Sequence, residues 1–474
     1  MAGLYHTLGV AADSLFASRQ GVDTAGHNIS NAHTEGYSRQ RVDLEGRHPL
    51  ETHGIIIGNG VFVKNISRSH DKFVEKQIND SNQDSGQSEI RYDEMKALES
   101  IFSPELGASL SDTINEFFGS LQGLSNFPEE LTVRTQVRES AQNLIAAFDR
   151  VDASLRTQQT DINQKILAQS EEVTTLLGNI AKLNIEINNM EAGTEREAGD
   201  LRDQQDRLLR QLSEKMDVSY YRTNMGMLTV RGPRQSLLVD MGYAASMAVK
   251  VRPDGTGFLD AYVIDPEGKS AKNISEYVTN GKLKGLIDIR DVVCTDLLQK
   301  TNDMARKIID NVNVVHREGF GIKDFKSASG RDFFESSADQ DRTIRDLKIS
   351  DVIMNSTDAI AAAASPFAPG DNVVANNLLR LREDKILDEG RATLTDFYAN
   401  MVGVLGLDVK RAEQRNQANE VILADLNKRR ESIAGVSLDE EASNLMRWQA
   451  NFTASSKVIT TVDEMLDTVI NLKR

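Results

Sequence analysis

Near its carboxyl end the chain reads LMRWQANFTASSKVITTVDEMLDTV at residues 445–469. Apolar residues recur there at alternating steps of three and four, which is the spacing of a seam along one side of a helix. One polar residue, Ser455, interrupts this seam. Its apolar members are Leu445, Trp448, Phe452, Ile459, Val462, Leu466 and Val469. The segment therefore predicts an amphipathic helix that needs a partner along one side.

The first 30 residues carry a matching seam with the same alternating steps, in which Ala11, Ser18 and Ala25 are the small members. Its larger apolar members are Leu4, Leu8, Leu15, Val22 and Ile29. Each seam is too thin to form a stable domain alone, so we predict that the two termini meet as helices and bury the seams against each other. Two independent surface helices are the alternative, because amphipathic helices are common.

The chain between these ends alternates helical and β-rich character. Helical spacing from Val137 to Met190 predicts one helix about 80 Å long, and hence an elongated molecule. Short β-branched and aromatic runs separated by turn residues predict strands over 217–282. The dipeptide Asn59-Gly60 lies between the runs 55–57 and 61–63, which predicts an early hairpin.

These patterns predict a mainly α fold with β-rich insertions. The chain is expected to run outward and return, so that its terminal helices pair as a coiled-coil-like domain. At 474 residues it has room for about three domains. The predicted domains are a terminal helical domain (1–60 with 431–474), a long-helix bundle (61–216 with 283–318 and 372–430) and a β-rich outward domain (217–282 with 319–371).

Composition excludes several classes of function. With 55 Lys and Arg against 71 Asp and Glu, the net charge of −16 argues against a nucleic-acid partner. No apolar run approaches the length of a membrane span, and no basic residue precedes Arg19, so a secretory signal peptide is not expected. The single cysteine, Cys294, lies on an apolar helical stripe and is predicted to be a buried thiol. Phosphate-loop, zinc-protease and esterase motifs are absent from the sequence, so we predict no catalytic residue and no cofactor.

Six of the seven histidines fall within the first 70 residues, and a metal-dependent enzyme is therefore a remote alternative. These six are His6, His27, His33, His48, His53 and His70. None follows another at the four-residue helical spacing of a metal-binding pair, and no acidic residue or cysteine joins them at a recognised spacing. We therefore predict solvated or hydrogen-bonding histidines and no metal site.

After the first predicted helix the chain reads NISNAHTEGYSRQ at residues 28–40. This string closely resembles the amino-terminal signature of bacterial flagellar axial proteins, the family of rod, hook and hook-associated subunits. The resemblance marks Asn28, Ser30, Asn31, Gly36 and Tyr37 as signature residues. Matches along the whole chain, especially the tail 432–442, narrow the resemblance to the hook-associated subgroup. A hook or rod subunit stays open as the alternative.

The resemblance implies a non-enzymatic structural subunit that forms the junction between flagellar hook and filament and assembles through its terminal helices. The implied partners are further copies of the chain, the hook protein, the next hook-associated protein and a cytoplasmic export chaperone at the C-terminal helix. The implied route is export from the cytoplasm without a cleaved signal peptide, ending in the extracellular flagellum. Trp448 and Asn451-Phe452 depart from the pattern, because a Tyr-Gln-rich stretch is usual there.

Overall fold

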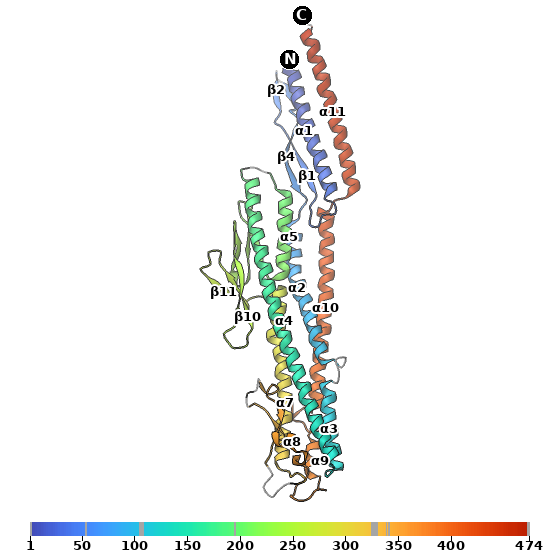
Figure 1. Ribbon diagram of the computed structural model, residues 1–474. Coiled ribbons are helices and arrows are strands. Elements are labelled where there is room, and N and C mark those ends of the chain that lie inside the picture. Colours follow the sequence, from blue (N-terminus) through green and yellow to red (C-terminus); the bar gives the residue numbers. More distant parts are fainter. Residues whose placement is uncertain are drawn as a thin grey trace. The chain divides into compact units, whose positions relative to one another are not determined.

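The computed structural model describes residues 2–52, 55–103, 109–193, 196–323, 330–337, 339 and 342–471. Contacts group the chain into two compact units. Unit 1 comprises Met1–Gln87, Leu167–Leu283 and Ala418–Arg474, and unit 2 comprises Ser88–Ile166 and Lys284–Gln417. Helices dominate both units, and strands form only small antiparallel sheets in the described part of the chain, which confirms the predicted fold class (Figure 1). The three-part domain division stays a prediction.

Helices account for most of the chain. The α-helices are α1 (Ala2–Ser30), α2 (Lys72–Phe102), α3 (Leu110–Asn126), α4 (Leu131–Glu191), α5 (Gly199–Lys215), α6 (Gly281–Asp288), α7 (Cys294–Arg317), α8 (Asp351–Asn355), α9 (Val373–Arg380), α10 (Leu394–Ala434) and α11 (Leu438–Asn471). Shorter helical turns are η2 (Pro233–Gln235), η3 (Ile289–Val293), η5 (Thr357–Ala359) and η6 (Asp388–Gly390). Helix α4 has 61 residues and contains the whole of the predicted helix 137–190. That prediction is confirmed.

The strands are short, and every strand pair is antiparallel. Unit 1 contains β1 (Gln40–Gly46), β2 (Leu50–Thr52), β3 (Ile55–Ile57), β4 (Val61–Arg68), β5 (Ser219–Arg222), β6 (Leu228–Arg231), β7 (Leu237–Asp240), β8 (Tyr243–Ala244), β9 (Ser246–Val251), β10 (Leu259–Ile264) and β11 (Ala271–Asn273). Unit 2 contains β12 (Phe334–Glu335) and β13 (Lys348–Ile349). The sheet orders are β1-β4, β2-β3, β5-β6-β7-β8, β11-β10-β9 and β12-β13. The strands predicted over 217–282 are thus confirmed.

The hairpin predicted around Asn59-Gly60 is wrong in its pairing. Strand β3 pairs with β2, so that Leu50 lies opposite Ile57, whereas β4 pairs with β1. The two runs that flank Asn59-Gly60 are therefore consecutive parts of one arm of a long interrupted hairpin. Pro49 in the opposite arm has no N–H to donate, so the ladder breaks there instead of closing a tight turn at Gly60.

In unit 1 the β5–β8 sheet is fixed to α4 by one buried amide. Asn184 Nδ2 donates to the carbonyl oxygens of Leu228 and Met241, both at 2.7 Å, and its Oδ1 accepts from the Leu228 N–H at 2.8 Å. Asn184 is 1% exposed, so these bonds satisfy a side chain that would otherwise be costly to bury. In the same unit, Val74 and Ile78 of α2 pack with Leu426 of α10.

Unit 2 has an aromatic core. Phe117 of α3 has ring-centroid distances of 5.5 Å to Phe118, 6.0 Å to Phe333 and 5.9 Å to Phe334, and each of these four rings is at most 2% exposed. Buried His316 of α7 lies edge-on to Phe333, with 5.5 Å between ring centroids. All four phenylalanine rings of this cluster are thus buried within unit 2.

Within unit 2 the long helix α4 contacts the segment 290–317. Arg290 Nη1 donates to Asn163 Oδ1 at 2.8 Å, and Gln159 Nε2 donates to the Arg290 carbonyl at 3.2 Å. Cys294 at the start of α7 is buried, which raises the pKa of its thiol to about 12 and confirms the prediction of a buried thiol. None of the described helices has the length and hydropathy needed to cross a bilayer.

Candidate functional site

The terminal helices α1 and α11 lie side by side and run antiparallel, with both chain ends at the same end of the pair (Figure 1). Contacts recur at intervals of seven residues on both helices, which is the repeat of a coiled coil. They are Ser14 with Ser455, Gly21 with Trp448, and Asn28 with Glu441. The prediction that the termini meet as helices is confirmed.

The pair buries its small residues and leaves its larger ones partly open. The buried members of the seams are Ala11, Ser18, Ala25, Ser455 and Val462. The half-buried members are Leu4, Leu8, Leu15, Val22, Ile29, Leu445, Trp448, Ile459 and Leu466. Phe452 and Val469 remain 37% and 40% exposed. One copy of the chain therefore covers only part of the apolar surface that its two seams present.

Trp448 packs on a glycine. A Cβ atom placed on Gly21 would lie 2.2 Å from the indole Cδ2 of Trp448, far inside van der Waals contact. The absence of a side chain at position 21 thus makes the socket into which the indole fits. Sequence reasoning missed Gly21, although its place seven residues before Asn28 in the heptad was a usable signal.

Both the nitrogen and the oxygen of the side-chain amide of the signature residue Asn28 are hydrogen-bonded. Its Nδ2 donates to the Gln40 carbonyl at 2.8 Å and to Glu441 Oε2 at 3.1 Å. Its Oδ1 accepts from the Tyr37 hydroxyl at 2.7 Å and from the Gln40 N–H at 2.9 Å. At 1% exposure such an amide is stable only when its partners are all present. Asn28 therefore joins the end of α1 to the following loop and to the start of α11.

Glu441 completes this junction with an ion pair. Arg39 donates through Nε at 2.8 Å and through Nη2 at 2.7 Å to Glu441 Oε1, and the carboxylate is 2% exposed. The Arg39 N–H also donates to the Ala434 carbonyl at 2.8 Å. Sequence reasoning missed this pairing, which joins residues 402 positions apart. The sequence does place Glu441 seven residues before Trp448, in the same heptad position, and this spacing could have indicated its contact with α1.

Tyr37 must keep its proton to serve this junction, because its hydroxyl donates to Asn28. Burial raises the pKa of Tyr37 well above its usual value, and the carboxylates of Asp200, Asp203 and Glu441 raise it further. The same hydroxyl lies 3.0 Å from His27 Nδ1. Because the Tyr37 proton points to Asn28, His27 Nδ1 is the donor of this second bond.

The other signature residues shape the turn. The side chains of Ser30 and Asn31 donate to carbonyls four residues earlier, at 2.9 and 3.1 Å, which ends α1. Gly36 has φ +80°, a conformation that favours glycine. Its carbonyl accepts from Arg430 Nη2 at 2.8 Å. All five signature residues thus lie in one junction around the base of the terminal pair.

A buried charge network fixes the junction to α2 and α5. Glu75 accepts from Arg210 at 2.7 Å and from Arg430 at 3.0 Å. Asp203 accepts from both the N–H and the hydroxyl of Ser38 at 2.7 Å. Buried carboxylates held by arginine forks in this way are costly to break, since loss of one partner strands the other.

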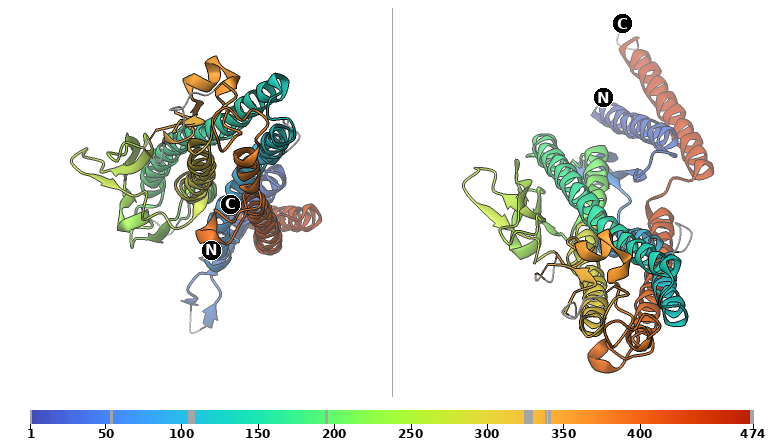
Figure 2. Two further views of the ribbon diagram at one scale, coloured as in Figure 1. Left: turned by 90° about the horizontal axis from the view of Figure 1, so that it is seen from below. Right: turned by 60° about the horizontal axis from the view of Figure 1, so that its bottom comes forward.

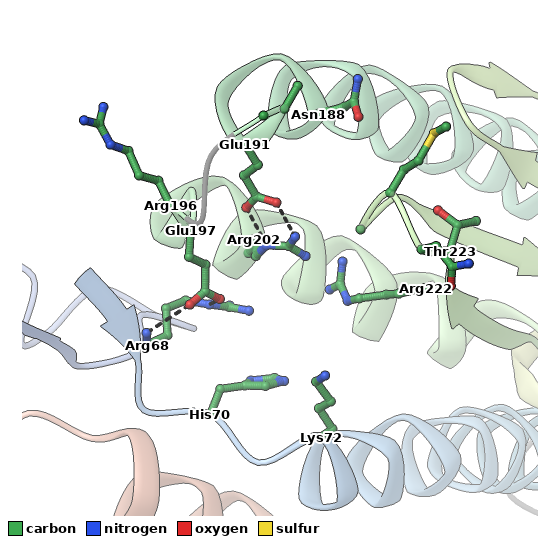
Figure 3. Close-up of a pocket in the computed structure, with 15 residues that line it drawn as sticks. Arg68, His70, Lys72, Asn188, Glu191, Arg196, Glu197, Arg202, Arg222 and Thr223 are labelled. Carbon is green, nitrogen blue, oxygen red and sulfur yellow. Dashed lines mark hydrogen bonds and ion pairs between the residues drawn. The ribbon is translucent and has the colours of Figure 1, made fainter. Parts of the chain in front are cut away.

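A cavity of about 960 Å³ lies beside this network in unit 1 (Figure 3). Its wall includes Arg68, His70, Lys72, Arg202 and Arg222. Arg68 pairs with Glu197 at 2.9 Å, and Arg202 pairs with Glu191 through Nε at 2.7 Å. Burial lowers the pKa of His70, so this imidazole is neutral at pH 7. Pairing neutralises much of the positive charge of the wall, which is the pattern of a structural ion network.

The six N-terminal histidines do not gather at one site. His6 Nε2 lies 3.2 Å from the Gly58 carbonyl, His27 contacts Tyr37, and His70 lines the cavity, while His33 and His48 are exposed. His53 lies outside the described residues. Within the described ranges, no three His, Cys, Asp or Glu side chains form a group suited to a metal ion.

Comparisons with known proteins agree with this architecture. Residues 95–334, just over half of the chain, match the family model "Flagellar hook-associated protein FlgK helical domain". Residues 431–472 match the model of the C-terminal region of flagellar basal body rod FlgEFG proteins. The chain is 28% identical to flagellar hook-associated protein 1 of Bacillus subtilis over 99% of both chains, and 24% identical to that of Salmonella typhimurium over 98% of this chain and 99% of the other.

A solved structure shares the fold. The flagellar hook junction protein FlgK from Burkholderia pseudomallei aligns with a TM-score of 0.68 at 13% identity, over 76% of this chain and all of the other. The paired termini, the signature junction and the matched C-terminal region define an axial protein of the bacterial flagellum. Within that class the chain belongs to the family of flagellar hook-associated protein FlgK. This family is structural, so the chain is not an enzyme, and the metal-enzyme alternative is set aside on that ground.

Proposed function

We propose that this chain is a structural subunit of the junction between flagellar hook and filament, and that copies assemble through α1 and α11. The observation that carries this proposal is the incomplete burial of the terminal seams. Phe452 and Val469 are 37% and 40% exposed, and the seam residues that α1 buries are the small ones, Ala11, Ser18 and Ala25. Exposed apolar seams of this kind find full burial only in neighbouring subunits.

Beyond the seam, α11 carries a second apolar face. We define its open face as the exposed residues Met446, Ala450, Ala454, Val458 and Met465, which recur at steps of four and seven. A single antiparallel partner covers one side of a helix, so this face is available to a further copy. Two apolar sides on one helix suit a packed ring better than an isolated pair.

The proposed partners follow from the family and from these surfaces. Further copies of the chain would complete the ring, with the hook protein on one side and the next hook-associated protein on the other. Before export, a cytoplasmic chaperone would cover α11, because an exposed apolar helix invites premature association. Extracellular flagella are the proposed final location.

Deletion of residues 443–474 tests the proposal. The truncated chain should lose filament attachment in cells, because both apolar sides of α11 are removed. Unit 2 contains no residue of α11, so its unfolding transition should stay in place. A matched control deletes 220–280, the β-rich segment, where tolerance is expected. A truncated chain that still supports filament attachment would overturn the proposal. Retention of the deleted chain in the cytoplasm with normal folding would instead separate an export defect from an assembly defect.

A further inference from the structure

The β2–β3 hairpin is the most exposed apolar element of unit 1. Ile55, Ile56 and Ile57 are 64%, 75% and 41% exposed, and Leu50 is 47% exposed. The two strands form a separate two-stranded sheet, so neither outer edge is paired. In the left view of Figure 2 this pale blue hairpin stands clear of α1 and α11. A two-stranded hairpin is marginal in water without a surface to pack on.

Both faces of the hairpin carry exposed apolar side chains. Leu50 lies opposite Ile57 in the ladder, and Ile55 is two residues away, so these three side chains share one face. Ile56 lies on the other face, opposite Glu51. A hairpin that is open at both edges and exposes isoleucine on both faces can insert between partners.

The root of the hairpin is fixed to the terminal pair. Arg47 forms an ion pair with Asp13 of α1 at 2.7 Å. On the other arm, a Cβ atom placed on Gly60 would lie 3.1 Å from Val10 Cγ1. A neighbour seated on α1 or α11 therefore meets the hairpin at a set position, so the hairpin continues the proposed assembly surface.

The hairpin and the open face of α11 carry charges of opposite sign. Glu51 has no ion-pair partner within the described residues. Arg447 and Lys457, which flank Met446 and Val458, are likewise without an ion pair there. In the part of the chain that the structure describes, the apolar hairpin thus carries a carboxylate without an ion pair, and the apolar stripe carries two such cations. When complementary surfaces lie at different places on one chain, the contact between copies is heterologous, and repetition generates a ring or a helix.

Size also favours a second copy. A stable interface buries about 800 Å² per partner, which four partly exposed aliphatic side chains do not supply. The hairpin must therefore be one part of a larger contact that also covers α11. We propose that the β2–β3 hairpin of one copy seats on the open face of α11 in a second copy. This inference rests on the proposed function and specifies one contact between copies in the proposed assembly.

Cross-linking in assembled flagella tests this contact. The native Cys294 is fully buried, so only the introduced cysteines are available for cross-linking. Cells expressing Ile56→Cys copies together with Ala454→Cys copies should give a cross-linked dimer of the full chain. The matched control replaces Ile56→Cys by Tyr243→Cys, which is 69% exposed on another sheet of unit 1 and should give no dimer with Ala454→Cys.

A charge exchange sharpens the result. Glu51→Lys should reduce the dimer yield severalfold, and combining it with Arg447→Glu and Lys457→Glu should restore the yield. The inference is overturned if the chain is present in flagella and no dimer forms, or if Ile56→Cys cross-links to a different protein. Absence of the full chain from flagella would overturn the proposed function itself, and the inference with it.

Discussion

The aromatic core of unit 2 and the terminal pair of unit 1 bury apolar surface in opposite ways. In unit 2, Phe117 and Phe333 are fully buried by residues of the same chain. In unit 1, α1 and α11 bury alanines and serines, while Phe452 stays 37% exposed. The first arrangement is complete in one molecule. On the proposed function the second is completed by neighbouring copies, so stability of the monomer and competence for assembly should depend on different residues.

The largest expected effect separates these two properties directly. Phe117→Ala removes a fully buried ring and should lower the free energy of unfolding by about 3–5 kcal/mol. Phe452→Ala removes a partly exposed ring and should cost the monomer about 1 kcal/mol, because little area is buried there. Urea titration measures both variants. Filament attachment should be lost for Phe452→Ala. If Phe452→Ala destabilised the monomer more than Phe117→Ala does, the proposed separation between monomer stability and assembly would be wrong.

Asn28→Ala should have the next largest effect, at the base of the terminal pair. The change leaves the Gln40 N–H and carbonyl without their hydrogen-bond partner and removes the bond to Glu441. It should lower the free energy of unfolding by about 1–3 kcal/mol, because buried polar groups are left unsatisfied. Asn31→Ala is the control, since the Asn31 side chain bonds only locally. Thermal unfolding and proteolysis of the termini measure the difference. Equal losses for the two variants would show that the junction does not depend on Asn28.

Gly21→Ala tests whether the terminal pair has a specific fit in spite of its small buried area. The added methyl group collides with Trp448 and should cost about 1–3 kcal/mol through overpacking. Gly26→Ala in the same helix meets nothing within 4 Å and should instead stabilise α1 by about 0.5–1 kcal/mol. Helix content and melting of the pair by circular dichroism measure both variants. Similar behaviour would mean that the indole does not pack as described.

The smallest expected effect is a pH dependence of unit 1 through His70. Burial lowers the pKa of His70; the carboxylate of Asp206 partly opposes this by raising the pKa, and the guanidinium of Arg68 lowers it further. A base with a lowered folded-state pKa contributes stability above its unfolded pKa of about 6.5, and that contribution is lost as pH falls towards the folded value. His70→Asn should therefore flatten the fall in melting temperature between pH 7.5 and 5. Exposed His48→Asn is the control, and a profile unchanged by His70→Asn would remove His70 as the source.

The periodic features of this fold were predictable, whereas its specific contacts were not. The seams of α1 and α11 and the length of α4 follow from local spacing, which each segment carries alone. The Gly21 socket depends on Trp448, and the role of Glu441 depends on Arg39, so both require a partner about 400 residues away in sequence. The pairing of β3 was misjudged for a related reason. The Asn-Gly turn signal at 59–60 suggests a partner after the turn, whereas the actual partner, β2, lies before β3 in the sequence.

The contact between Asn28 and Glu441 spans 413 residues of sequence. Closing so long a loop costs entropy before any contact repays it, and contacts of high sequence separation form late in folding. Helix α1 contacts β1 and β4 early in the sequence, but its helical partner α11 is missing until nearly the whole chain is available. The terminal pair can form only once α11 is present, so an incomplete chain lacks part of the proposed assembly surface. On the proposed function, an unfinished chain is therefore unable to polymerise through this pair.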